Sequence, residues 1–199
     1  MKEVLLPSVY AGPVSWYRAF FSTENVRIDV HENYVKQTWR NRCRIAGPNG
    51  VQDLVVPVKT EGNHTAVKNV RIDYSESWQR KHWGAITSSY GKSPFFEFYS
   101  DRFRPFYFQR DWEMLTSLNH ELLRVTLEAF GVKKEFSLTQ EFIPYAENDL
   151  RKIISPKHKN EEMNSSRYVQ VFGERHGFIP GLSVLDLIFC TGPDARNYL

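Results

Sequence analysis

Apolar and polar residues alternate with two different periods near the start of the chain. VLLPS (4–8) is a short apolar run typical of a buried strand, and NVRIDV (25–30) alternates as a strand does. Between them, the apolar residues of AGPVSWYRAFFS (11–22) recur at helical spacing, with Pro13 where a first helical turn tolerates it. This order of strand, helix and strand predicts a βαβ unit whose two strands are parallel.

The middle of the chain predicts a hairpin followed by helices. RCRIAG (42–47) and VQDLVVPV (51–58) flank an Asn-Gly pair, which is a strong hairpin signal. VKNVRIDY (67–74) is a further strand candidate. Helical periodicity then predicts a helix over 76–91, capped by Ser75 and ended by Gly91.

Periodicity also predicts the last elements. A second helix is expected over 111–130, with Asn119 as a carboxamide inside its apolar stripe that needs a partner, and EFSLTQEF (135–142) is a strand candidate. The polar stretch from 144 to 167 is expected to be a loop, and YVQVF (168–172) a strand.

LSVLDLIF (182–189) predicts a final helix. Asp186 interrupts its apolar run and either needs a partner, as Asn119 does, or forms the second half of a capping box with Ser183 as the N-cap. Neither an internal repeat nor a linker divides the sequence. We therefore expect one α/β domain over 1–199, with a βαβ start and a mixed sheet that an antiparallel hairpin extends and helices cover.

Composition narrows the class of protein. A hydrophobic fraction of 41% and an aromatic fraction of 15% are typical of a globular chain. A net charge of +3 is too small to argue for nucleic-acid binding, and the scattered histidines and cysteines match no metal motif. Cys43 and Cys190 lie far apart, and no apolar run suits a signal peptide or a membrane span, so we expect a cytoplasmic protein.

The densest group of polar side chains is HENYVKQTWRNRCRI (31–45). If this stretch is a strand, Lys36, Arg40 and Arg42 share one face, and Asn41 lies on the other among apolar groups. Guanidinium groups grip phosphate or carboxylate bidentately, so the cationic face predicts an anion site. The alternative is a solvent-facing edge strand whose charges prevent aggregation.

Three further residues are candidates for the same site. His82 shares a helical face with Trp78, where it can act as a general acid or base or simply pack in the core. Tyr90 extends a polar seam two turns later. Glu97 lies among the aromatics of SPFFEFY (93–99), either buried against a cation or exposed on the surface.

Several long motifs together resemble the WbqC-like family of bacterial proteins. They are LPSVYAGPVSWYRAF, DVHENYVKQTWRNRCRI, VPVK, RIDYSESWQRKHW, SYGKSPFFEFY and GLSVLDLIFCTGPDARNYL, and they span nearly the whole chain. The recurring polar positions of the family fall here on Lys36, Arg40, Asn41, Arg42, His82, Tyr90 and Glu97. Where many members carry a Gln-Pro, this chain has Leu6-Pro7, and His31 stands roughly where an aspartate often precedes the lysine motif.

The resemblance implies a group transferase of bacterial cell-surface polysaccharide biosynthesis, such as that of lipopolysaccharide O-antigen. In that interpretation a basic cleft holds an anionic donor, for example a nucleotide sugar, through Lys36, Arg40 and Arg42. Asn41 orients the substrate, and His82 or His31 takes a proton from the acceptor. The alternative is a non-catalytic interaction protein that accompanies a biosynthetic enzyme. The sequence names no cofactor, and a homo-oligomer stays open.

Overall fold

A small parallel sheet organises the N-terminal part of the chain. The computed structural model describes residues 3–62, 64–108, 112–157 and 166–199. Strand β1 (Val4–Pro7) leads into helix α1 (Val14–Phe21), which returns the chain to β2 (Val26–Asp29). The two strands pair in parallel, as the sequence predicts, and β7 (Ser137–Leu138) joins the far side of β2, also in parallel.

A fourth segment continues this sheet beyond β1. The Leu5 amide donates to the Asn148 carbonyl, and the Leu150 amide donates to the Leu5 carbonyl, each over 3.0 Å. Asp149 therefore forms a parallel bridge with Leu5. Residues 148–150, β1, β2 and β7 thus run side by side in one direction, and their carboxyl ends meet at one edge.

The predicted hairpin is confirmed and forms its own sheet. Strand β3 (Arg42–Gly47) pairs in an antiparallel register with β4 (Gly50–Val55). A second short pair joins β5 (Val58–Lys59) to β6 (Arg71–Ile72), which follows the 3₁₀ turn η1 (Val67–Asn69). VKNVRIDY therefore supplies a turn and only two strand residues.

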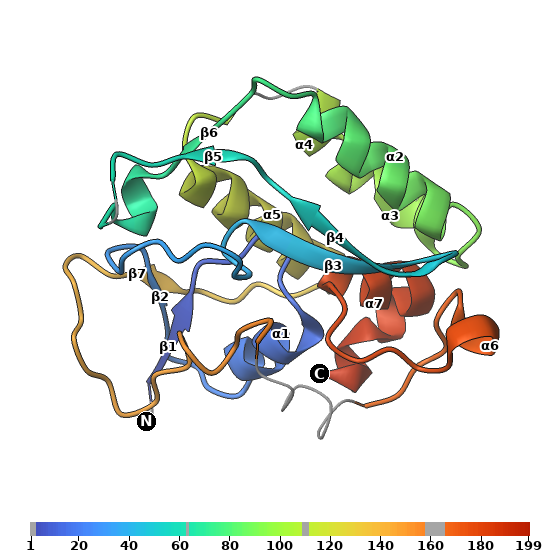
Figure 1. Ribbon diagram of the computed structural model, residues 1–199. Coiled ribbons are helices and arrows are strands. Elements are labelled where there is room, and N and C mark those ends of the chain that lie inside the picture. The colour runs from blue at the N-terminus through green and yellow to red at the C-terminus, as the bar shows by residue number, and fades with distance from the viewer. Residues whose placement is uncertain (1–2, 63, 109–111, 158–165) are drawn as a thin grey trace.

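Helices cover both sides of the hairpin. Helices α2 (Trp78–Tyr90), α3 (Phe96–Phe103) and α4 (Pro105–Phe108) lie together on one side (Figure 1). Helices α1 and α7 (Val184–Thr191) lie on the other side, and α7 also packs against α2 and α3. The remaining elements are α5 (Leu115–Ala129), α6 (Gly173–His176) and η3 (Gly192–Tyr198). The expected α/β class is confirmed.

Two predicted helix boundaries need correction. Helix α2 has Ser77 rather than Ser75 at its N-cap position, and Gly91 ends it as expected. Helix α5 begins at Leu115, and the predicted start at Asp111 lies outside the described residues.

The predictions for the last third of the chain are partly wrong. YVQVF forms no strand, and the side chains of Tyr168 and Gln170 bond to Asp186 and to the Ile179 carbonyl. Ser183 does cap α7, and its hydroxyl accepts from the Leu185 amide. Asp186, however, is no part of a capping box, since its buried carboxylate accepts from the Tyr168 hydroxyl at 2.6 Å.

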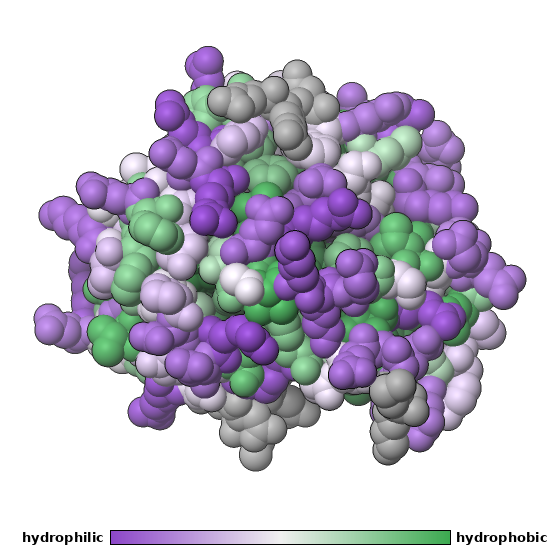
Figure 2. All heavy atoms as spheres, turned by 180° about the vertical axis from the view of Figure 1, so that it is seen from behind, coloured by the Kyte–Doolittle hydropathy of each residue, from purple (hydrophilic) through white to green (hydrophobic). Residues whose placement is uncertain are grey.

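Large aromatic side chains fill the core between these layers. Trp16, Trp39 and Trp78 are fully buried, and so are Tyr10 and Tyr90. Burying such side chains supplies most of the hydrophobic stabilisation of a domain this size. From behind, polar side chains cover much of the surface, with apolar ones showing between them (Figure 2). Among the described residues, no helix has the length and apolar character needed to cross a bilayer.

Candidate functional site

A pocket of about 590 Å³ lies at the carboxyl ends of the parallel strands. Its polar lining includes Glu32, Thr38, Arg40, Asp149, Arg151 and Lys152, and its apolar lining is Val35, Phe142, Pro144 and Ile153. These residues come from the segments that follow β2 and β7 and from the segment that begins beside β1. Open α/β sheets bind ligands at this edge, because loops from neighbouring strands converge there.

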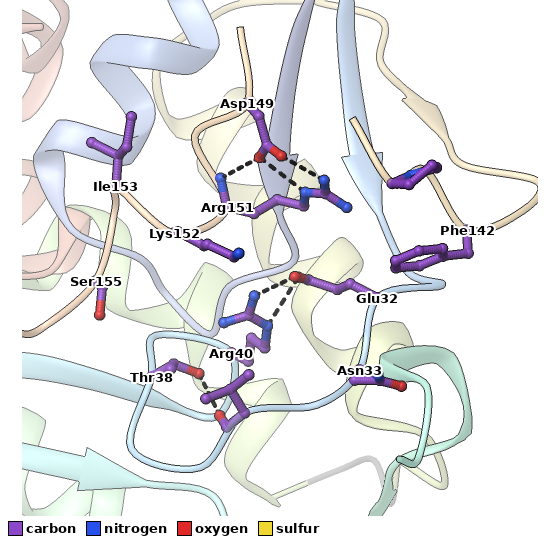
Figure 3. A pocket seen from close by; sticks show the side chains of 12 residues that line it. Glu32, Asn33, Thr38, Arg40, Phe142, Asp149, Arg151, Lys152, Ile153 and Ser155 are labelled. Carbon is purple, nitrogen blue, oxygen red and sulfur yellow. Dashed lines mark hydrogen bonds and ion pairs between the residues drawn. The ribbon is translucent and has the colours of Figure 1, made fainter. Parts of the chain in front are cut away.

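A buried ion pair forms one wall of the pocket. Arg40 donates from Nε to Glu32 Oε1 over 2.9 Å and from Nη2 to Glu32 Oε2 over 2.5 Å (Figure 3). The two residues are only 4% and 8% exposed. Burial raises the pKa of the Glu32 carboxyl above its ordinary value, against the opposing effect of the Arg40 guanidinium.

A second cluster of charges ties the pocket to the sheet. Arg151 donates to both carboxylate oxygens of Asp149, at 2.9 and 2.5 Å, and its Nη1 donates to Asp29 Oδ2 over 2.5 Å. The other oxygen of Asp29 accepts from the amides of His31 and Glu32 and from the Thr139 hydroxyl. The last residue of β2 therefore holds the start of the loop that carries Glu32.

These contacts change the expected electrostatics of the site. Glu32 and Asp149 line the pocket with Arg40, Arg151 and Lys152, and the buried Asp29 lies directly behind Arg151. Since the carboxylates offset the cations, the pocket is not the strongly basic cleft that the sequence predicts. Within the described ranges, no group of three or more His, Cys, Asp or Glu side chains suits a metal ion.

Asn119 from α5 supports the pocket from the core side. Its amide nitrogen donates to the Arg40 carbonyl over 2.9 Å and to the Ser8 hydroxyl over 3.1 Å. It therefore links the Arg40 loop to the residue that follows β1. The expectation that the Asn119 carboxamide has a partner is thus confirmed, and one partner is the backbone carbonyl of Arg40, which lines the pocket.

The cationic face predicted for residues 34–43 does not form. Residues 31–41 make bends and turns rather than a strand, and Gln37 adopts a left-handed φ of 60°. The Thr38 hydroxyl donates to the Val35 carbonyl over 2.7 Å, which closes the turn. The regular alternation that would place the cations on one face is therefore absent.

The candidates from this stretch consequently separate. Arg40 lines the pocket, whereas Lys36 is exposed and contributes nothing to its lining. Arg42 donates to Asp53 across the hairpin over 2.9 Å. Asn41 turns into the core, where its amide donates to the Val56 carbonyl over 2.8 Å.

His82 lies in the core rather than at the pocket. Its Nε2 is 3.1 Å from the Val55 carbonyl, and its Nδ1 is 2.9 Å from the Tyr10 hydroxyl. Because a carbonyl only accepts, Nε2 carries the proton and Nδ1 accepts from Tyr10. Burial lowers the pKa of His82 to about 4, so the ring is neutral at physiological pH. His82 is therefore a hydrogen-bonded residue of the core.

The other predicted residues also lie outside the pocket lining. The Tyr90 hydroxyl accepts from the Ala46 amide, and Glu97 is exposed on α3 instead of buried against a cation. His31 is half-buried, with Nδ1 3.1 Å from the Thr139 hydroxyl and Nε2 2.9 Å from Lys68 Nζ. Arg40 is thus the one predicted site residue that lines this pocket.

Sequence reasoning missed most of the charged groups that build the site. Asp149, Arg151 and Lys152 belong to the polar stretch that is expected to be only a loop. The available signal was Asp29, a carboxylate that directly ends an apolar strand and therefore faces the sheet edge. Its partner Arg151 lies 122 residues away, so no local pattern connects the two.

Comparison with known proteins places the chain in a family. Residues 22–170, which include the ion-paired residues of the pocket, match the WbqC-like protein family. The chain belongs to this family. It is also similar to an uncharacterized protein of Mycobacterium tuberculosis, with 25% identity over 83% of each chain. No solved structure matches this WbqC-like protein.

Proposed function

We propose that this WbqC-like protein is a cytoplasmic group transferase of bacterial cell-surface polysaccharide biosynthesis. It binds an anionic, phosphate-bearing donor in the pocket at the carboxyl ends of the parallel strands. The observation that carries the proposal is that the buried Glu32 carboxylate lines this pocket and is held in place by two hydrogen bonds from Arg40. The resemblance to the WbqC-like family supplies the polysaccharide setting, and the pocket supplies a place for the chemistry.

Glu32 is the base in this proposal. The acceptor's hydroxyl or amine loses its proton to Glu32 while its oxygen or nitrogen bonds to the transferred group and the phosphate-bearing leaving group departs. A raised carboxyl pKa suits this role, because a base works best when its pKa approaches the operating pH. His82 and His31 are less suited, since neither lines the pocket, whereas Glu32 does.

A ligand panel with matched lysine variants tests the proposal. Nucleotide sugars, nucleotides and acyl carriers are added to the protein, and its melting temperature is measured by differential scanning fluorimetry. A ligand at roughly 100 times its Kd raises the melting temperature by about 5 to 10 °C. Lys152→Gln, at the pocket, reduces this rise, whereas Lys36→Gln, outside it, leaves the rise unchanged.

Two results contradict the proposal. One is that no member of the panel stabilises the wild-type protein. The other is that Lys36→Gln weakens the stabilisation while Lys152→Gln does not, which would place the anion on the cationic run rather than in the pocket.

Exposed aromatic residues favour a second candidate function, a non-catalytic protein that docks on a biosynthetic enzyme. Phe98 on α3 is 68% exposed, and Phe108 at the end of α4 is 52% exposed. Exposed large apolar side chains mark interaction surfaces when they gather together. This function predicts that Phe98→Ser/Phe108→Ser abolishes co-purification of the enzyme while ligand binding in the pocket is retained.

A further inference from the structure

The pocket has a buried charged floor and a more exposed mouth. Glu32, Arg40 and Arg151 are all buried, whereas Lys152 and Phe142 are exposed. In Figure 3, Lys152 points into the pocket from the mouth, and the Glu32–Arg40 pair faces it from the opposite loop. A ligand with two chemically different ends therefore meets two different environments.

The floor disfavours a phosphate. All three donor nitrogens of the Arg151 guanidinium already bond to Asp29 and Asp149. Two of the three Arg40 nitrogens bond to Glu32. A phosphate placed here would face buried carboxylates, and like charges repel strongly where water is excluded.

The same floor suits the hydroxyl groups of a sugar. An ionised carboxylate offers about four acceptor positions, and Arg40 occupies two of those on Glu32. The Nη1 of Arg40 takes part in neither of these bonds and remains a donor. Thr38 adds a hydroxyl whose oxygen can accept, since its proton goes to the Val35 carbonyl. A hydroxyl can therefore donate to Glu32 and accept from Arg40 at once.

The mouth suits a phosphate. Lys152 is a compact positive charge at an exposed position, which favours a solvated phosphate group. Phe142 and Ile153 lie on opposite sides of the opening in Figure 3 and provide apolar surface for the rest of the ligand. We infer that the pocket binds a phosphate-linked sugar in one direction, with the sugar on Glu32 and Arg40 and the phosphates beside Lys152. This inference rests on the proposed function and adds the orientation of the ligand.

Isothermal titration calorimetry with sugar-bearing and sugar-free probes tests the orientation. The probes are UDP-glucose and dTDP-glucose, compared with UDP and dTDP. Glu32→Gln weakens binding of the sugar-bearing probes by about tenfold or more, because a neutral amide replaces the charged acceptor for the sugar hydroxyl, and it does not weaken UDP or dTDP, whose phosphates lie beside Lys152. Lys152→Gln weakens the binding of all four probes, sugar-bearing and sugar-free alike.

A measurement on the wild-type protein covers the case in which Glu32→Gln fails to fold. Salt screens an exposed charge far more than a buried hydrogen bond. Raising the salt concentration therefore weakens both UDP and UDP-glucose, and it weakens UDP more, because the terminal phosphate of UDP carries a negative charge that UDP-glucose lacks. If the phosphates occupied the buried floor, salt would hardly change the affinity for UDP.

The outcomes separate this inference from the function on which it rests. If none of the four probes and no other member of the ligand panel binds, the proposed function fails and the orientation fails with it. If the probes bind but Glu32→Gln weakens UDP as much as UDP-glucose, the orientation is overturned and the pocket remains the site. Binding of UDP that is insensitive to both Lys152→Gln and salt overturns the orientation in the same way.

Discussion

Replacing Arg151 tests whether the ion pairs hold the pocket onto the sheet. Arg151→Met keeps much of the side-chain volume but removes the guanidinium that bonds to Asp29 and Asp149. The side chains of Arg151 and Asp29 are 8% and 0% exposed, so the substitution leaves a buried carboxylate without its cation. Breaking a buried pair from one side costs about 3 to 5 kcal/mol. The Asp149 pair is more exposed and adds at most about 1 kcal/mol.

Urea unfolding followed by circular dichroism at pH 7 measures this loss. The matched control is Arg71→Met, whose partner Glu113 is exposed, and it changes the free energy of unfolding by less than about 1 kcal/mol. Adding Asp29→Asn to Arg151→Met removes the unpaired charge and restores part of the stability. A loss of under 1 kcal/mol in Arg151→Met, equal to that of the control, would refute the structural role of this cluster.

Three further predictions concern other parts of the structure. The pKa of His82 is about 4 in the folded state and 6.5 ordinarily, so the folded protein loses stability as pH falls from 6.5 to 4. In urea unfolding, His82→Gln flattens this dependence of stability on pH, and an unchanged slope would contradict the assignment of His82 as a buried, neutral ring. Asn119→Ala removes the hydrogen bonds to the Arg40 carbonyl and the Ser8 hydroxyl and lowers the free energy of unfolding by about 1 to 3 kcal/mol in the same assay. A wild-type free energy of unfolding would show that these bonds do not support the pocket. Gly192→Ala places a methyl against the ring of Phe95, at a residue with a φ of +55°, and lowers the melting temperature. Gly84→Ala in α2, where nothing lies near the added methyl, raises the melting temperature, and equal effects of the two substitutions would argue against the clash.

Local sequence patterns predict the local parts of the fold well. The βαβ start and the hairpin follow from periodicity and turn residues, because contacts within each unit decide them. The loop that carries Arg40 follows from no such pattern. Its residues have strand-like alternation, but the left-handed Gln37 and the turn at Thr38 override it.

The pairing of charged side chains is the part of the site that local sequence patterns do not predict. Composition shows which cations are present, and the fold decides which carboxylates they meet. The hairpin register places Asp53 opposite Arg44 and diagonal to Arg42, and both arginines donate to it. Arg40 pairs with Glu32 because the intervening loop folds back. The expected basic cleft therefore becomes a pocket of balanced charges, and only long-range contacts reveal the difference.

Hydrogen exchange with and without UDP-glucose tests the central claim most directly. Bound ligand slows amide exchange in the segments that it covers. The pocket predicts that protection appears in peptides spanning 31–40 and 149–157 and that Lys152→Gln reduces it. Protection confined to α3 and α4, or none at all at a saturating ligand concentration, would contradict the claim that this pocket is the functional site.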